Sequence, residues 1–343
     1  NSIAALLWGS IAHSENPIIQ SDIDWVASSI NTAEGRLAEY WILALDASNN
    51  CGKRELNEPY KSEIMRLCQV DEAKTAFTIP VITRQLAFLT TLDQTWAEQV
   101  IYPLFSDPDD ERASQAWHGF LGSRGPSDIV FNSLKGAFEN AVARLGSILP
   151  GKIDRFVEFY AAIALWRLSN PLEEWIPSLL VALTEEHRPI FSEKIRSLIM
   201  SMKLEDINKT WTSWLRSYWE GRIDGTPIPL SKQDARIMLE WLPYLEDQFP
   251  EAVVLAVKME KPPLEHCSFV RQIKSKNLAK RWPDDVSVLI VYLLSCDKES
   301  WSLYKLEDVL EQLPLNEISP QVLSDLNEAL IASGRKQLNP GGS

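Results

Sequence analysis

Hydrophobic positions recur along this 343-residue chain with the spacing of one helix face. Two such faces are Val130, Leu134, Phe138, Val142 and Leu145, and then Ile153, Phe156, Tyr160 and Ile163, the latter followed by polar Arg167. Residues three or four apart lie on the same side of an α-helix, whereas a half-buried strand alternates at every second residue. Alternating stretches are absent from the sequence, so the pattern predicts an all-α fold.

Prolines and glycines mark where the helices should begin and end. The expected starts share a capping side chain and a proline suited to a first turn: Asp107-Pro108, Asn170-Pro171 and Ser319-Pro320. The expected stops, where glycine can adopt the left-handed backbone that closes a helix, are Gly122, Gly221 and Gly334. We expect about 14 to 16 helices joined by short turns. Because no fixed repeat period is found, the expected architecture is an irregular HEAT-like α-solenoid, a superhelical array of helix pairs.

The segment from Gly221 to Leu230 is the clearest internal boundary, because it holds two glycines and two prolines that break either regular element. It separates an N-terminal helical array, residues 1–220, from a C-terminal array, residues 231–335. Residues 336–343 end in Pro340-Gly341-Gly342-Ser343 and are expected to form a disordered tail or an expression linker. With the apolar start at Asn1, this ending suggests a piece of a larger protein.

The chain holds 13 tryptophans, most of them within or at the start of apolar helical stretches. We interpret them mainly as large side chains that fill gaps between packed helices, with a stacking platform for bases or a ligand as the alternative. Several aromatic residues stand directly before the 221–230 loop, where glycines and prolines often mark a mobile binding edge. The candidate partner-binding residues are therefore Trp211, Trp214, Tyr218 and Trp219.

The formal net charge of -13 argues against general binding of nucleic acid or an anionic membrane, since both need clustered basic side chains. Proteins or small molecules are the expected partners. The four cysteines, Cys51, Cys68, Cys267 and Cys296, form no CxxC pair and indicate reduced thiols in the cytoplasm. No apolar run reaches the roughly 18 residues of a membrane span.

No catalytic or metal-binding pattern passes the spacing tests. The acidic cluster Asp107, Asp109, Asp110 and Glu111 stands at an expected helix N-terminus, where the helix dipole favours negative charge without a metal. The histidines, His13, His118, His187 and His266, share no HxxxH or HExxH spacing, and adjacent His266 and Cys267 point different ways in a helix. GxSxG and glycine-rich phosphate loops are missing. We expect no enzyme, no cofactor and no metal.

The segment from Lys258 to Arg281 departs from the acidic background, with seven basic and two acidic side chains and a net charge of +5. Such a segment followed by an aromatic residue is compatible with a site for nucleic acid, a nucleotide phosphate or an acidic protein. The simpler interpretation is a solvated helix face that complements acidic neighbours in the same molecule. The residues of this alternative anion or nucleic-acid patch, within 258–282, are Arg271, Lys274, Lys276, Lys280, Arg281 and Trp282.

One block carries a family resemblance. It reads Phe88-Leu89-Thr90-Thr91-Leu92-Asp93, Trp96, Tyr102-Pro103-Leu104-Phe105 and, after the acidic turn, Ala116-Trp117-His118-Gly119-Phe120-Leu121. With Lys280-Arg281-Trp282-Pro283-Asp284-Asp285, the helix through Leu294 and a last helix ending near Ala332, the chain resembles the C-terminal helical domain of unknown function in bacterial sirtuin-like antiphage defence proteins. The resemblance covers the chain from Ile79 to Ala332.

This resemblance implies a function for the chain. In that family an N-terminal sirtuin-type domain hydrolyses NAD after infection, and the helical region senses a phage component or mediates assembly. The glycine motifs and catalytic histidine of the enzymatic domain are not found in this sequence. We therefore expect a sensor or scaffold that binds a protein trigger, such as a phage component, or forms homo-oligomers, and that controls an upstream effector domain.

Overall fold

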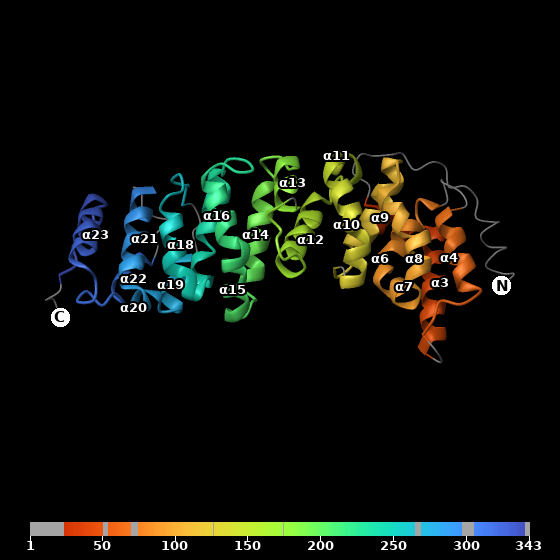
Figure 1. Ribbon diagram of the computed structural model, residues 1–343, viewed down its shortest axis with the longest axis horizontal. Helices are drawn as coiled ribbons and strands as arrows, with labels where there is room; N and C mark the ends of the chain where they lie inside the picture. Colours follow the sequence, from red (N-terminus) through yellow and green to blue (C-terminus); the bar gives the residue numbers. More distant parts are fainter. Residues whose placement is uncertain are drawn as a thin grey trace. The chain divides into compact units, whose positions relative to one another are not determined.

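A computed structural model of the protein describes residues 24–50, 54–69, 75–125, 127–173, 175–264, 269–296 and 305–339 (Figure 1). Within these ranges helices alternate with turns and no strand occurs, which confirms the all-α prediction. The solenoid form stays a prediction. The chain divides into two compact units, residues 1–160 and 161–343. Among the described helices, none combines the length and the apolar character needed to cross a bilayer.

Unit 1 consists of short helices joined by tight turns. They are α2 (Trp25–Ser29), α3 (Ala33–Asn50), α4 (Tyr60–Gln69), α6 (Ile79–Arg84), α7 (Leu86–Leu92), α8 (Gln94–Val100), the 3₁₀ helix η1 (Tyr102–Ser106), α9 (Asp110–Leu121), α10 (Asp128–Ala143), α11 (Leu145–Ile148) and the larger part of α12 (Ile153–Trp166). The predicted apolar faces of α10 and α12 point inward, since Phe138 and Phe156 are both fully buried.

The core of unit 1 surrounds Trp117 of α9, whose indole N–H donates to the carbonyl oxygen of Phe105 at 3.1 Å. The ring of Phe138 meets this indole edge-on at a centroid distance of 4.8 Å, a favourable geometry for aromatic pairs. Gly119, two residues further on, lets α9 approach α6, because a Cβ atom there would lie 2.2 Å from the carbonyl oxygen of Pro80. This close crossing of α6 and α9 thus depends on a residue without a side chain.

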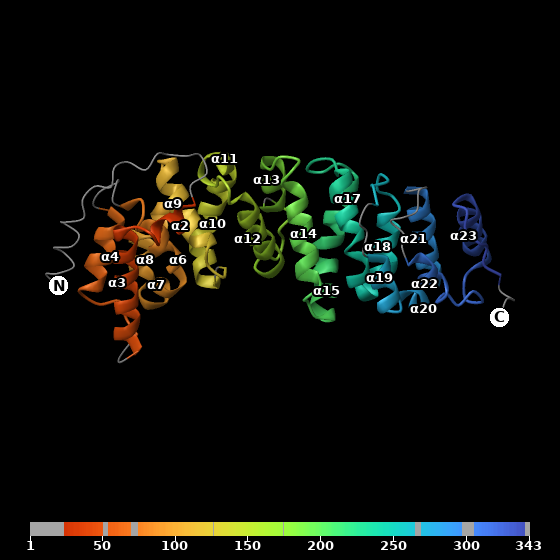
Figure 2. The ribbon, with the colours of Figure 1, turned by 180° about the vertical axis from the view of Figure 1, so that it is seen from behind.

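Unit 2 continues the all-helical pattern. Its elements after α12 are α13 (Trp175–Ala182), α14 (Arg188–Ile199), α15 (Leu204–Thr210), the π-helical turn η2 (Trp211–Leu215), α16 (Arg216–Ile223), α17 (Lys232–Leu239), the 3₁₀ turns η3 (Leu242–Tyr244) and η4 (Glu246–Gln248), α18 (Phe249–Ala256), α19 (Phe269–Ser275), α20 (Leu278–Arg281), α21 (Pro283–Cys296), α22 (Leu306–Leu310) and α23 (Pro320–Ala332). Within this unit α14 packs against α17, α18 against α21, and α21 against α23, as Figures 1 and 2 together show.

The predicted helix ends are met in part. Pro320 is the first residue of α23, and Gly334 has the left-handed φ of 75° expected beyond its end. The helix predicted after Asn170-Pro171 begins only at Trp175, and Pro171 lies in the preceding turn, where its carbonyl oxygen accepts from the Ile176 amide at 2.9 Å.

Two further predicted ends differ in detail. At the acidic turn Asp109 is the cap, accepting from the Glu111 amide, so Pro108 precedes the cap instead of entering the first turn. Gly122 does follow the end of α9, but with a right-handed φ of -72°. Gly221 ends no helix, because α16 continues to Ile223 and carries the buried Arg222 into the core.

The 221–230 segment lies inside unit 2, whereas the division between the two units falls within α12, between Tyr160 and Ala161. The loop is tied to the helix before it, since the Thr226 amide donates to the Gly221 carbonyl oxygen at 2.8 Å. Gly225 makes the turn possible with a left-handed φ of 84°. A buried ion pair, described below, joins the two sides of this loop, which therefore connects two parts of one packed core.

Candidate functional site

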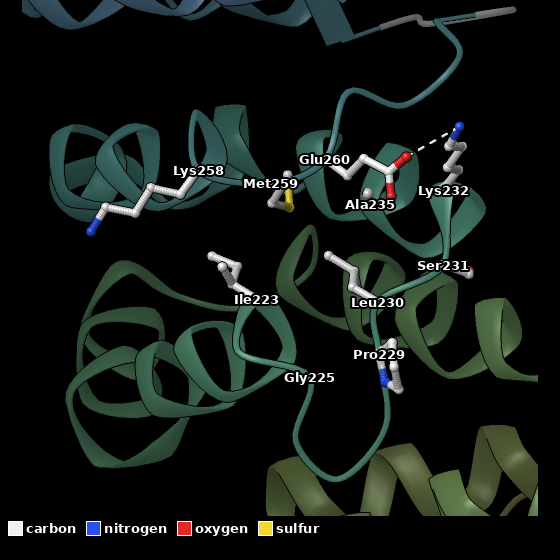
Figure 3. A pocket seen from close by; sticks show the side chains of 10 residues that line it. All are labelled: Ile223, Gly225, Pro229, Leu230, Ser231, Lys232, Ala235, Lys258, Met259 and Glu260. Atoms are coloured by element: carbon white, nitrogen blue, oxygen red, sulfur yellow. Dashed lines mark ion pairs between the residues drawn. The ribbon is translucent and has the colours of Figure 1, made fainter.

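A cleft opens in unit 2 where the 221–230 loop passes from the end of α16 to the start of α17 (Figure 3). Its volume is about 190 Å³, and it is lined by Ile223, Gly225, Pro229, Leu230, Ser231, Lys232, Ala235, Lys258, Met259 and Glu260. Pockets for cofactors and drug-sized ligands hold roughly 300 to 1,000 Å³. The cleft is therefore suited to a single side chain of a partner and is too small for a whole cofactor.

The cleft is apolar at its centre. In Figure 3 Met259, which follows α18, lies across the opening from Ile223 of α16 and Leu230 of the loop, and both of these point toward it. Met259 and Ala235 are buried, whereas Ile223 and Leu230 are half-buried and reach the opening. The arrangement exposes aliphatic side chains of three separate segments to one enclosed space.

The rim of the cleft is charged. Lys232 and Glu260 form an ion pair at 3.2 Å between the first turn of α17 and the segment after α18. Lys258 also lines the cleft, but in Figure 3 its side chain extends away from Met259 and the opening, and it forms no ion pair with any described residue. The charges of Lys232 and Glu260 offset each other, so Lys258 leaves a positive charge to one side of the cleft, which favours a partner with a negative group on that side.

A buried polar network supports the wall formed by α16 and α17. Arg222 and Asp234 are fully buried and pair at 3.0 Å. The hydroxyls of Ser192 and Ser231 donate to the Asp234 carboxylate at 2.9 and 3.2 Å, and Arg222 donates to the Tyr218 hydroxyl at 2.9 Å. Burial raises the pKa of Tyr218, so its phenol stays neutral. Paired and hydrogen-bonded in this way, the two charges hold α14, α16 and α17 in one arrangement.

The four aromatic residues predicted to bind a partner lie in the core. Trp211, Trp214, Tyr218 and Trp219 are only 0 to 3% exposed. The reason is the turn η2, where the π-helical backbone and the following α16 direct all four side chains inward. The expectation of an exposed aromatic edge is therefore corrected: these side chains fill the space between helices, as the more general interpretation of the tryptophans states.

One of these buried rings contacts a residue that lines the cleft. The indole N–H of Trp219 donates to the sulfur atom of Met259 at 3.4 Å, and the Trp241 ring meets the Trp219 ring edge-on at 5.6 Å. Trp241 in turn donates to the carbonyl oxygen of Ser192 at 3.0 Å. The aromatic cluster thus lies directly beneath the residue that forms the cleft floor.

The basic segment is largely neutralised by acids of the same unit. Lys274 pairs with Asp308 at 3.1 Å, which lowers the pKa of that carboxyl group. Lys276 pairs with Glu246 and lies 5.2 Å from the centre of the Tyr244 ring.

In the rest of the patch one cation is paired and two are not. Arg281 pairs with Asp247 and lies over the half-buried ring of Trp282 at 5.3 Å. Arg271 and Lys280 are exposed and form no ion pair with a described residue. The segment therefore behaves mainly as a helix face that complements acidic neighbours, which leaves two unpaired cations from the predicted patch.

The other predicted candidates have structural roles where they are described. Asp107 pairs with Arg112 at 3.1 Å, and Asp110 pairs with Arg144. His118 is buried on α9, and His187 contacts Thr184 at 2.7 Å. No group of three potential metal ligands occurs among the described residues. His13, Cys51, His266 and Cys267 lie outside the described residues, as do residues 340–343.

Comparison with protein families gives a match to part of the chain. Residues 168–330, just under half of the chain, match a family described as a domain of unknown function, DUF4020. The matched residues include the whole cleft and the segment Lys280 to Asp285, whereas the block from Phe88 to Leu121 lies outside them. No curated protein and no solved structure matches the chain. The match supports a domain of unknown function in unit 2.

Sequence reasoning found one side of the cleft and missed the other. The loop residues Gly225, Pro229 and Leu230 were signalled by their glycines and prolines, while Lys258 was noticed only as part of a basic segment. Met259 stands between two charged residues in sequence, and nothing in that pattern marks it as a cleft floor. Only the packing of α18 beside α16 brings it there.

Proposed function

We propose that the chain is a helical sensor or scaffold that binds a protein trigger, and that the cleft beside the 221–230 loop receives a side chain of that trigger. The observation that carries the proposal is the cleft itself: a space of about 190 Å³ with Met259 and aliphatic side chains at its centre and charged side chains around them. Protein interfaces derive most of their affinity from a few side chains that enter such pockets.

The cleft suits this role because its walls are held in place before a ligand arrives. Met259 is fixed by Trp219 from below, and the α16 and α17 walls are joined by the pair of Arg222 and Asp234. A prearranged site loses less conformational entropy on binding, so more of the contact energy appears as affinity.

The proposed consequence of binding is control of an effector outside this chain. The resemblance to sirtuin-like antiphage defence proteins supplies the effector, an NAD-hydrolysing domain, and the class of trigger, a phage protein. Such control requires the trigger to bind the active arrangement of the full protein more tightly than the resting one. In this proposal the chain itself has no catalytic role.

The full protein in its host tests the proposal through two matched substitutions. Leu230→Asp places a charge in the apolar cleft, and Val181→Asp places the same charge on α13 at a side chain that is 60% exposed. Cellular NAD is measured before and after phage challenge. We expect NAD to fall in cells with the unchanged protein and with Val181→Asp, and to be retained with Leu230→Asp.

Other outcomes count against separate parts of the proposal. Equal NAD loss in both variants would show that the trigger does not use the cleft. Constant NAD in cells that carry the unchanged protein would contradict the assigned effector. Circular dichroism of both purified variants is the check that the helical fold is intact.

A further inference from the structure

We infer that the side chain received by the cleft of unit 2 is aromatic, and that an acidic residue stands next to it in the partner. This partner class rests on the function proposed above, because it specifies the chemistry that the same cleft recognises. Three properties of the cleft support it: its volume, the chemistry of its lining and the distribution of charge around it.

The volume of the cleft matches an aromatic side chain. An apolar cavity of about 150 Å³ in an engineered protein binds benzene, and the cleft offers about 190 Å³. The additional space accommodates the methylene group that joins a ring to its backbone. A smaller aliphatic side chain would leave part of the cleft unfilled, and the residues that line it would then lack contacts on that side.

The wall formed by the 221–230 loop suits a planar group. Gly225 lines the cleft, and a Cβ atom there would meet no atom within 4 Å apart from its chain neighbours. The left-handed φ of 84° favours glycine at this position, so the space stays free of a side chain. The ring of Pro229 adds a flat apolar surface on the same loop (Figure 3). A planar side chain can therefore lie close to the loop.

The floor of the cleft favours a ring over an aliphatic chain. The thioether of methionine makes favourable contacts with aromatic rings, and Met259 lies across the opening from Ile223 and Leu230. Met259 already has such a neighbour beneath it, since the Trp219 indole N–H donates to its sulfur atom at 3.4 Å. An aromatic side chain in the cleft would place the thioether between two aromatic groups.

The charges around the opening differ between its two sides. Lys232 and Glu260 pair with each other at 3.2 Å on one side. Lys258 extends away from the opening on the other side, is exposed and forms no ion pair with a described residue. Its ammonium group is therefore placed to meet a carboxylate on the residue next to the inserted ring, and it disfavours a basic residue there.

Nuclear magnetic resonance of labelled methionine methyl groups in the intact chain tests this inference. The chain holds five methionines, and Met259→Leu identifies the Met259 signal. The probes are the capped tripeptides Glu-Phe-Glu, Glu-Leu-Glu and Lys-Phe-Lys, titrated at low salt. We expect the ring current of Glu-Phe-Glu to shift the Met259 signal, with about fivefold tighter binding than for Glu-Leu-Glu. Lys-Phe-Lys is expected to bind about threefold more weakly than Glu-Phe-Glu, and high salt is expected to reduce that difference.

Matched controls separate the cleft from nonspecific contact. Met200 is 50% exposed in the same unit, and its signal is expected not to move with any of the peptides. Leu230→Asp is expected to lose the binding of Glu-Phe-Glu, whereas Val181→Asp is expected to retain it.

Each contrary outcome overturns a defined part of the inference. Equal or tighter binding of Glu-Leu-Glu at the Met259 signal would overturn the aromatic occupant and leave the cleft as a receptor for a side chain. Equal binding of Lys-Phe-Lys would overturn the acidic neighbour. A Met259 signal that no peptide shifts would overturn the inference as a whole. The proposed function fails separately, when NAD loss after phage challenge is equal with Leu230→Asp and Val181→Asp.

Discussion

The indole N–H of Trp219 donates to the sulfur atom of Met259 at 3.4 Å and so joins the buried aromatic segment to the floor of the cleft. The backbone of Met259 is also held, since the Tyr292 hydroxyl donates to its carbonyl oxygen at 3.2 Å. Methionine has several rotatable bonds and fills irregular spaces readily. These two contacts therefore determine which shape the cleft presents to a partner.

Trp219→Ala is expected to destabilise unit 2 strongly, because the fully buried indole packs against Trp211 and Trp241 as well as Met259. Removing a large buried aromatic side chain typically costs about 3 to 5 kcal/mol of unfolding free energy. Unfolding in urea, followed by circular dichroism, measures the loss. The matched control is Trp166→Ala, whose side chain is 47% exposed and whose removal is expected to change stability by about 0.5 kcal/mol or less. Equal losses in both variants would contradict the assigned packing.

Removing one charge of the buried pair of Arg222 and Asp234 should lower the free energy of unfolding more than removing both charges. Asp234→Asn leaves the Arg222 guanidinium buried without its counter-ion and is expected to cost about 3 to 5 kcal/mol. The double variant Arg222→Met with Asp234→Leu removes both charges. Its loss of unfolding free energy is expected to be clearly smaller than the sum of the losses in the single variants Arg222→Met and Asp234→Leu. A double-mutant cycle of urea unfolding gives the coupling free energy.

The surface pair of Arg216 and Glu220 provides the control for that cycle. Both side chains are more than two-fifths exposed, and their coupling is expected to be about 0.5 kcal/mol or less. Additive costs at Arg222 and Asp234 would mean that the two side chains do not interact as the structure indicates.

Stability should depend on pH through His118. Burial, together with the charge of Lys152, lowers the pKa of this histidine from 6.5 to about 4, and neither ring nitrogen has a hydrogen-bond partner among the described residues. The unfolded chain therefore binds the proton near pH 6.5 and the folded chain only near pH 4. The folded chain therefore has its full stability, as far as His118 is concerned, above about pH 6.5. As the pH falls toward 4, protonation of the unfolded chain lowers the free energy of unfolding by on the order of 3 kcal/mol.

His118→Leu isolates this effect, because carboxylates elsewhere titrate alike in both proteins. The difference in unfolding free energy between the two chains is measured by urea unfolding from pH 8 to pH 4. We expect it to shift in favour of the variant by on the order of 3 kcal/mol as the pH falls. A difference that stays constant over this range would show that His118 is protonated equally in the folded and unfolded states.

Nucleic acid should bind weakly, because Lys274, Lys276 and Arg281 are already paired with acids. Fluorescence anisotropy with a labelled single-stranded oligonucleotide at low and moderate salt measures this. We expect no saturable binding. Saturable binding that weakens steeply with salt, and that is lost in Arg271→Ala with Lys280→Ala, would instead support a nucleic-acid function for the basic segment.

The fold class followed from the sequence because helical period is a property of each segment alone. The face of Ile153 to Ile163 predicted α12 directly, and the face of Val130 to Leu145 predicted α10 up to Val142, whereas Leu145 begins the separate helix α11. Helix ends were less predictable, since they depend on tertiary contacts. Gly221 looks like a stop in sequence, but α16 continues past it because Arg222 finds its partner Asp234 in the core.

The candidate site was predictable only in part for the same reason. A loop rich in glycine and proline indicates an irregular segment, and it does line the cleft at Gly225 and Pro229. Aromatic residues next to such a loop have no sequence feature that separates a binding surface from a core. Trp211 and Trp214 are core residues because the η2 turn directs both side chains inward, where they are buried.

The central claim is that the cleft receives a side chain of a protein partner, and site-specific photo-crosslinking tests it most directly. A photoreactive amino acid is placed at position 230 or, as control, at position 181 of the full protein in its host, and the crosslinked protein is identified and purified. We predict a product specific to position 230, and an affinity of that protein for Leu230→Asp about 30-fold lower than for Val181→Asp. Identical products from both positions, or equal affinities for the two variants, would contradict the claim.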